Sequence, residues 1–123
     1  MDKVFVKGLR VETVIGVYDW ERTIKQSVIF DLIMKKDLRA AASTDDLQNT
    51  LDYKVVTDRI TEYVEQTEFQ LIESLAESVA ELIQKEFGVE WLELTLTKPD
   101  AISKCEGVGI VIERGTKVPE VCF

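Results

Sequence analysis

The spacing of apolar residues changes twice along this chain of 123 residues, and this change restricts the possible folds more than any other feature. Apolar and polar residues alternate over residues 3–15 and 27–35, which predicts two strands that form a hairpin. The spacing is helical, in two stretches, over residues 53–87, and it alternates again over 92–98 and 108–113. Strands and helices grouped in this way favour an α+β fold, with a four-stranded antiparallel sheet and both helices on one face.

Glycine and proline residues mark where the predicted elements bend or end. Alternation slips around Gly8, which predicts a β-bulge in the first strand. Gly88 follows the second helical stretch and is a favourable residue for ending a helix. Pro99 cannot donate a backbone hydrogen bond, so strand pairing is expected to end beside it. Residues 39–50 are polar, which predicts a loop with a short helical turn.

Composition is typical of an acidic globular protein. A length of 123 residues with 46% hydrophobic residues fits a single domain over 1–123, whose modest core would gain from assembly with other copies. The net charge is −8 and no run of lysine or arginine occurs, which argues against partners such as nucleic acids or anionic membranes. No apolar run approaches the ~20 residues that span a bilayer, and the first residues do not resemble a signal peptide. A cytoplasmic location is therefore expected.

The chain contains no histidine, which restricts its possible chemistry. Its two cysteines, Cys105 and Cys122, do not form a metal-binding CxxC pair, and both are expected to be free thiols. A zinc or transition-metal site has little support, and a serine or threonine nucleophile would lack its histidine base. Proton transfer near neutral pH must therefore use a lysine, a carboxylate, a tyrosine or a cysteine.

Four residues lie where the predicted elements could place them in a site. Lys98 ends a strand, and the rigid Pro99 that follows restricts its position. Glu73 lies at the start of the second helix, where a carboxylate beside free helix amides can bind the planar N–H edge of an amidine or guanidine. Tyr53 precedes the first helix, and Glu21 lies in the connection between the first two strands. Each also has an ordinary interpretation as a surface charge, a helix-stabilising charge or a packing aromatic.

Taken together, these residues and their neighbours resemble the bacterial dihydroneopterin aldolase family. The resemblance covers nearly the whole chain, and the order and spacing of its short motifs are specific. It implies the tunnelling fold (T-fold), in which four subunit sheets join into a ring-shaped barrel and two rings stack into a homo-octamer. It also implies active sites at subunit boundaries, each built from two chains. The matching motifs are DKVFV (2–6), IGVYDWE (15–21), LDY (51–53), LIE (71–73), KP (98–99) and GVGIVIER (107–114).

The resemblance also implies a reaction and a role for each candidate residue. Dihydroneopterin would be cleaved between the first and second carbons of its side chain, giving 6-hydroxymethyl-dihydropterin and glycolaldehyde on the route to folate. The C=N bond of the substrate would hold the electrons, so that no metal, Schiff base or cofactor is needed. Lys98 is implied as the general acid/base, and Tyr53 as a substrate contact that helps to deliver a proton to the product carbon. Glu73 and the backbone at Ile72 would bind the pterin, and Glu21 would position the reacting end.

Two departures from the family pattern and two alternative functions accompany this resemblance. Many relatives carry His-Gly at Ile15-Gly16 and a proline-rich loop at residues 100–103, and these differences bear on loop-dependent affinity and rate. The nearest alternative is a dihydroneopterin triphosphate 2'-epimerase that shares the lysine, and epimerisation is also expected as a side activity. The other is a non-catalytic pterin-binding ring scaffold, which the presence of Lys98 and Tyr53 argues against. Zinc-dependent enzymes of the same fold are disfavoured by the lack of histidine.

Overall fold

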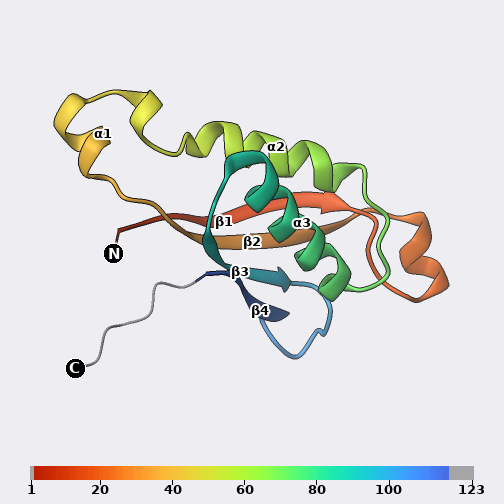
Figure 1. Ribbon diagram of the computed structural model, residues 1–123. Helices are drawn as coiled ribbons and strands as arrows, with labels where there is room; N and C mark the ends of the chain where they lie inside the picture. Colours follow the sequence, from red (N-terminus) through yellow and green to blue (C-terminus); the bar gives the residue numbers. More distant parts are fainter. Residues whose placement is uncertain (1, 117–123) are drawn as a thin grey trace.

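A computed structural model of the protein describes residues 2–116, in which four strands form one antiparallel sheet (Figure 1). The strands lie in chain order: β1 (Lys3–Thr13), β2 (Gln26–Lys35), β3 (Trp91–Lys98) and β4 (Val108–Gly115). Each strand pairs with the next in antiparallel orientation, so β1 and β4 are the two edges of the sheet. The predicted hairpin and the predicted α+β fold are both confirmed.

Two long helices cover one face of the sheet (Figure 1). α2 (Tyr53–Glu65) packs on β1, and α3 (Ile72–Phe87) packs on β3 and β4. The connection between β2 and α2 contains the short helix α1 (Arg39–Thr44) and a 3-10 turn, η2 (Leu47–Asn49). A second 3-10 turn, η1 (Asp19–Thr23), lies between β1 and β2. η1 and the start of α3 are the elements that build the site described below.

The core lies between the sheet and the two helices, because alternate strand residues point towards the helical face. On the opposite face, Ile29, Asp31 and Ile33 of β2 remain partly exposed. Each helix contributes apolar residues spaced three or four positions apart, as its sequence pattern predicts. The residues with no exposed surface include Val28, Phe30, Leu32 and Met34 of β2, Leu92, Leu94 and Leu96 of β3, Val56, Ile60 and Val64 of α2, and Leu75, Ala76, Val79 and Ile83 of α3.

Glycines bend or end the elements where the sequence pattern predicts. The pairing of β1 with β2 slips between Val6 and Leu9, and Gly8 adopts a φ of +72° at this bulge. The Gly8 amide donates a hydrogen bond of 2.7 Å to Asp31 Oδ1 on β2. Gly88 ends α3 in the left-handed conformation, which glycine adopts without steric cost.

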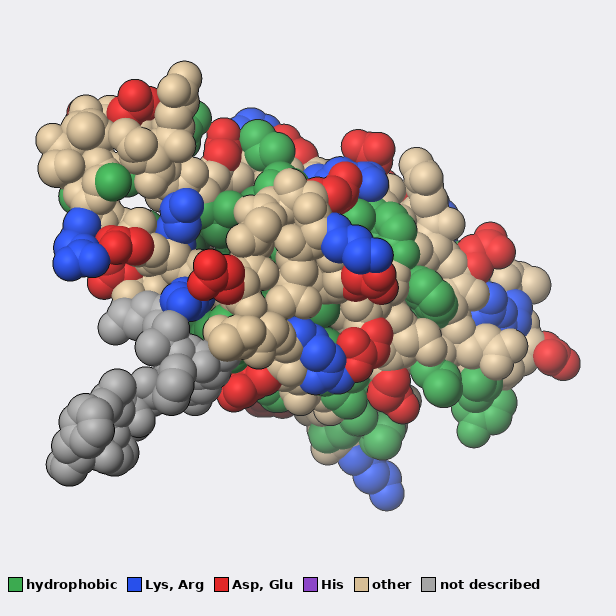
Figure 2. Space-filling view, in the orientation of Figure 1, with side chains coloured by type: hydrophobic (Ala, Val, Ile, Leu, Met, Phe, Trp, Pro, Cys, Tyr) green, Lys and Arg blue, Asp and Glu red, His purple; other side chains and the backbone are tan. Residues whose placement is uncertain are grey.

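Acidic and basic side chains are intermixed on the surface shown in Figure 2. Within α2, Lys54 pairs with Asp58, and across the two long helices Arg59 Nε lies 3.0 Å from Glu86 Oε2. Exposed pairs of this kind contribute little to stability. None of the helices within residues 2–116 has the length and the apolar character that crossing a bilayer requires.

Candidate active site

Lys98, which is partly buried, and Glu21, which is buried, form an ion pair where β3 ends. Lys98 is the last residue of β3, and its Nζ lies 2.6 Å from Glu21 Oε2. Only 15% of the Lys98 side chain and 6% of the Glu21 side chain are exposed. The ordinary interpretation of these two residues as surface charges is therefore wrong. They are 77 positions apart in the sequence, and η1 brings Glu21 to the end of the strand.

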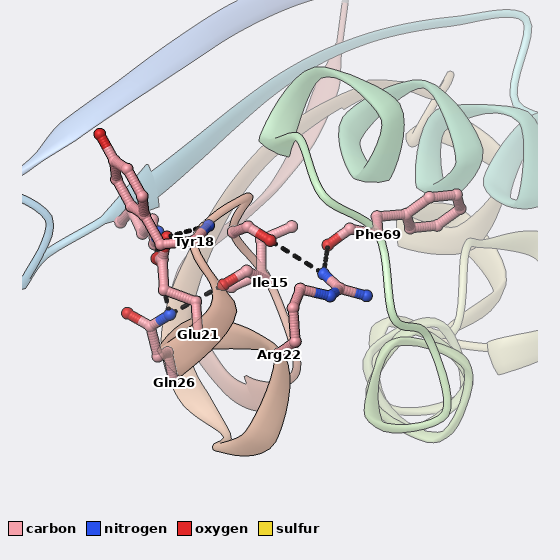
Figure 3. Close-up of polar contacts among 8 residues, drawn as sticks. Ile15, Tyr18, Glu21, Arg22, Gln26 and Phe69 are labelled. Carbon is pink, nitrogen blue, oxygen red and sulfur yellow. Dashed lines mark hydrogen bonds and ion pairs between the residues drawn. The ribbon is translucent and has the colours of Figure 1, made fainter.

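Two further groups hold the Glu21 carboxylate in place (Figure 3). Gln26 Nε2 donates to Glu21 Oε2 at 3.0 Å and to the Ile15 carbonyl at 2.8 Å. The backbone amide of Tyr18 donates to Glu21 Oε1 at 3.3 Å. The hydrogen bond from Lys98, followed by that from Gln26, lowers the pKa of Glu21 below its ordinary value, although burial acts in the opposite direction. Glu21 is therefore ionised at neutral pH, and it accepts a hydrogen bond from Lys98 Nζ.

Because Gly16 has no side chain, the Glu21 carboxylate can occupy the space beside it. Its φ of +125° lies in a region that residues with side chains rarely adopt. A Cβ atom at this position would lie 2.2 Å from Glu21 Cδ, well inside van der Waals contact. Any other residue at position 16 would therefore displace the carboxylate or shift the backbone.

The N-terminal turn of α3 contributes a second carboxylate to the cavity beside this ion pair. The cavity has a volume of about 390 Å³, and Glu21, Lys98, Ile72 and Glu73 all line it. Glu73 is exposed in the first turn of α3, where a helix leaves backbone amides without intrahelical partners. Leu71 occupies the N-cap position and makes no side-chain hydrogen bond to these amides. The helix end can therefore offer both acceptor and donor groups to a ligand.

Exposed apolar side chains surround these polar groups. Tyr18, Trp20 and Ile102 line the cavity, and each is more than half exposed. Large apolar side chains that gather on a surface typically mark a binding site. The cavity therefore suits a flat, small molecule with a polar edge for Glu73 and a group that exchanges protons near Lys98.

The structure brings together four of the five predicted site residues and leaves Tyr53 apart. Tyr53 is the first residue of α2, which is capped by the side chain of Asp52, and 65% of Tyr53 is exposed. It is not among the residues that line the cavity in a single chain. The four that line it are Glu21, Ile72, Glu73 and Lys98.

Three residues that support the site were not predicted from the sequence. Gly16 makes room for Glu21, Gln26 holds its carboxylate, and Arg22 connects η1 to the segment before α3. A glycine directly before the connection to η1 is a weak signal for the first of these. Nothing in the local pattern distinguishes Gln26 or Arg22 from ordinary surface residues.

Cysteine and acidic side chains do not gather into a metal-binding cluster in the part of the chain that the structure describes. No group of three or more His, Cys, Asp or Glu residues between positions 2 and 116 is arranged to hold a metal ion. Cys105 is a free, exposed thiol in the loop after β3. Cys122, the other predicted free thiol, lies outside the described residues.

Known proteins are similar to this chain in both sequence and fold. Residues 4–113 match the sequence model of the dihydroneopterin aldolase family. A dihydroneopterin aldolase of Escherichia coli K12 is 43% identical over 120 residues, which cover 98% of each chain. The crystal structure of E. coli dihydroneopterin aldolase in complex with neopterin has a TM-score of 0.91 at 44% identity, covering 94% of this chain and 100% of that one. A dihydroneopterin triphosphate 2'-epimerase of Pseudomonas aeruginosa is 30% identical, over 91% of each chain. The chain belongs to the dihydroneopterin aldolase family.

Proposed function

We propose that the protein is a dihydroneopterin aldolase, which cleaves 7,8-dihydroneopterin into 6-hydroxymethyl-7,8-dihydropterin and glycolaldehyde. The observation that carries this proposal is the Lys98–Glu21 ion pair, because it places a proton donor at a cavity in a chain without histidine. Family membership supports the same reaction, since a relative 43% identical over nearly its whole length is a dihydroneopterin aldolase.

Substrate binding uses the first turn of α3. The pterin ring presents an amino group beside a ring N–H, and the Glu73 carboxylate accepts hydrogen bonds from both. The backbone at Ile72 makes a further contact with the ring. Glu73 and Ile72 are adjacent at the start of the helix, and both line the cavity that also contains Lys98. A carboxylate that accepts two parallel N–H bonds fixes the orientation as well as the affinity of a flat ligand.

Cleavage breaks the bond between the first and second carbons of the side chain. The hydroxyl on the second carbon loses its proton to water, and this carbon becomes the aldehyde carbon of glycolaldehyde. The electron pair of the broken bond moves through the first carbon into the C=N bond of the ring, whose nitrogen takes up a proton. Lys98 supplies that proton through a water molecule, and Glu21 positions the reacting end.

Protonation of the first carbon completes the reaction. The electron pair returns from the ring and forms a C–H bond with a proton that Tyr53 helps to deliver. The ring nitrogen gives its proton back to Lys98, which restores both the C=N bond and the starting state of the enzyme. One proton leaves the substrate hydroxyl and one joins the product carbon, so the reaction consumes no protons.

Lys98 acts as an acid and not as a nucleophile. Formation of a Schiff base requires a neutral amine. Lys98 Nζ instead donates a hydrogen bond of 2.6 Å to the Glu21 carboxylate, which holds it as a donor and not as an amine free to attack a carbonyl. Because the pterin ring itself takes up the electrons, the proposed reaction needs neither a Schiff base nor a metal ion.

Epimerisation at the second side-chain carbon is a second candidate activity, and the relationship to the Pseudomonas aeruginosa 2'-epimerase favours it. If glycolaldehyde adds back before it leaves, the new bond can form on either face of its carbonyl group. A triphosphate substrate would require positive charge near the cavity. Lys98 is the only cation among the described residues that line it, and Lys98 is already paired. The part of the site that one chain supplies therefore favours dihydroneopterin over its triphosphate.

We also propose that the active sites lie between subunits of a homo-oligomer, with rings of four that stack into an octamer. The exposure of Tyr53 supports this, because its role in catalysis requires the cavity of a second chain. The two edge strands, β1 and β4, could continue the sheet into neighbouring copies. A location in the reducing cytosol fits the free thiol of Cys105.

Coexpression of two inactive variants tests whether each site uses two chains. Lys98→Ala and Tyr53→Ala subunits that mix at random should restore activity to about a quarter of the sites, because some sites then receive both native residues from different chains. Activity no higher than that of either variant alone would contradict shared sites.

Product analysis tests the proposed reaction. The purified protein should release equal amounts of glycolaldehyde and 6-hydroxymethyl-dihydropterin from dihydroneopterin, and a chelator should leave the rate unchanged. Parallel incubation with dihydroneopterin triphosphate identifies the preferred substrate. Rapid inversion of the triphosphate without aldehyde release would favour the epimerase. Tight pterin binding without turnover of either compound would favour a non-catalytic binding protein.

A further inference from the structure

We infer that Arg22 is a positioning residue that fixes the spacing between the two polar parts of the active site. The first part is the Lys98–Glu21 ion pair, and the second is the α3 N-terminal turn with Glu73. This inference rests on the proposed function, in which the pterin ring contacts the second part while its side chain reaches the first. The distance between the two parts then decides whether one substrate can use both.

The Arg22 guanidinium donates hydrogen bonds to backbone carbonyls of two separate segments. Its Nη1 lies 2.9 Å from the Gly16 oxygen and 3.0 Å from the Phe69 oxygen, and its Nη2 donates to the Glu68 oxygen. The side chain is half-buried, and Figure 3 shows its guanidinium between Ile15 and Phe69. A single side chain therefore connects the segment around η1 with the segment that leads into α3.

Each of these segments leads into one part of the site. Gly16 packs against the Glu21 carboxylate, and Phe69 directly precedes Gln70, which lines the cavity before α3 begins. Within the described part of the chain, the two hydrogen bonds that join residues 15–23 to residues 66–72 both come from Arg22. Thr13 of β1 separately donates a hydrogen bond to the Thr67 oxygen, so loss of the Arg22 bonds would release η1, and not the end of β1, from Glu68 and Phe69.

Arginine suits this role better than any other side chain. Its five donors lie in one rigid plane, so it can hold several carbonyl oxygens at fixed positions, whereas the single ammonium of lysine has no such fixed geometry. Small errors in the placement of a reacting group have large effects on catalysis. Arg22 does not line the cavity, so it acts on the substrate indirectly, through the positions of Glu21 and Glu73.

Two pterins of different length test this inference. Neopterin carries the side chain and should use both parts of the site, whereas unsubstituted pterin should use only the α3 turn. In Arg22→Met, which keeps the apolar stem but loses all donors, the affinity for neopterin should fall about tenfold and that for pterin less than about threefold. If Arg22→Met only lowered the fraction of correctly folded protein, the apparent affinities for both pterins would fall by the same factor. An unchanged ratio of the two dissociation constants would therefore overturn the inference.

Arg59→Met is the matched control. Arg59 also joins two elements, because it pairs with Glu86 across α2 and α3, but it does not line the cavity. Its replacement should leave both pterin affinities, and their ratio, at the values of the native protein. A loss of the neopterin preference in this variant as well would show that any weakened contact between elements has this effect, which also contradicts a specific role for Arg22.

Hydrogen–deuterium exchange tests, without any substrate, whether Arg22 joins the two segments. Residues 16–23 and residues 68–72 should both exchange faster in Arg22→Met and in Arg22→Lys, and neither should do so in Arg59→Met. Acceleration in only one segment, or in neither, would overturn the inference. Arg22→Lys keeps the charge and serves if Arg22→Met does not fold. If the native protein neither binds nor cleaves pterins, the proposed function fails, while the exchange rates still decide whether Arg22 joins the two segments.

Discussion

Two ion pairs lie near opposite ends of the β3–β4 ladder, and they differ in burial far more than in geometry. At one end, Arg114 Nε lies 3.0 Å from each carboxylate oxygen of Glu77 on α3. Even so, 39% of this arginine side chain and 55% of this glutamate side chain are exposed. At the other end, Lys98 and Glu21 make a contact of 2.6 Å with exposures of only 15% and 6%.

The difference shows that the number of hydrogen bonds does not identify a functional pair. Water can replace the partners of the exposed Arg114–Glu77 pair, so removing either residue costs little. Burial of Lys98 and Glu21 carries a desolvation penalty that offsets the attraction between their charges. Burial alone therefore does not show that the pair stabilises the fold. The Lys98–Glu21 pair is instead shielded from solvent and lines a cavity, which is typical of a catalytic site.

The largest expected difference between the two ends is in turnover. Lys98→Ala should lower kcat about 10³-fold, since it removes the proposed acid, while neopterin should still bind. Arg114→Ala, at the exposed pair, should keep kcat within about twofold of the native value. Glycolaldehyde release measures the rates, and fluorescence titration measures binding. A normal rate in Lys98→Ala would remove the assignment of this residue.

Two glycines with positive φ values sharpen the same contrast. Gly16→Ala should lower kcat/KM about 100-fold, because its Cβ would displace the Glu21 carboxylate. Gly8→Ala meets no atom within 4 Å and should only lose about 1 kcal/mol of stability, with unchanged activity. Steady-state kinetics and urea unfolding of both variants separate these effects. Native activity in Gly16→Ala would show that the position of Glu21 is unimportant.

Two glutamates on α3, one turn apart, extend the comparison to binding. Glu73→Ala should weaken pterin binding by about 1.5–3 kcal/mol, because it removes a charged acceptor and leaves the pterin donors unpaired. Glu77→Ala removes the exposed partner of Arg114 and should leave the affinity unchanged. Isothermal titration with neopterin gives both values. Equal affinities in the two variants would contradict recognition by Glu73.

The smallest expected effect is on acid stability. Because the folded protein holds the pKa of Glu21 below its ordinary value of 4.5, ionised Glu21 stabilises the fold above that pH. This stabilisation is lost as the pH falls through the lowered pKa. The difference in unfolding free energy between the native protein and Glu21→Gln should therefore be present at pH 7 and shrink below about pH 4.

Glu77→Gln is the control for this pH dependence. The pKa of Glu77 is also lowered, by its hydrogen bond from Arg114, but solvent screens this exposed pair. Its contribution should be smaller and should vanish in 1 M salt, whereas that of Glu21 should persist. Urea unfolding at several pH values, at low and high salt, measures both. Equal salt sensitivity in the two variants would contradict the difference in burial.

The fold could be predicted from the sequence because its signals are local. Alternation predicted every strand of the described sheet, and helical spacing predicted α2 and α3. Gly8 and Gly88 lie where the bulge and the helix end occur, and Pro99 follows the last paired residue of β3. Each of these features depends on residues within a few positions, so no knowledge of tertiary contacts was required.

The site was harder to predict because it depends on contacts between distant residues. Glu21 is polar and lies in a connection, so its burial against Lys98, 77 positions away, has no local signal. The same is true of Arg22, whose partners Glu68 and Phe69 lie 46 and 47 positions away. The roles of Glu73 and Tyr53 came from the family resemblance, and a single chain does not bring Tyr53 to the cavity.

A crystal structure of the protein with bound neopterin tests the central role of the ion pair most directly. In the predicted structure, the amino edge of the ring contacts the Glu73 carboxylate. The ring nitrogen next to the pterin's own side chain lies close enough to Lys98 Nζ for a single water molecule to bridge the two atoms. A pterin bound elsewhere, with the Lys98–Glu21 pair intact and out of its reach, would contradict the role of this pair in proton transfer.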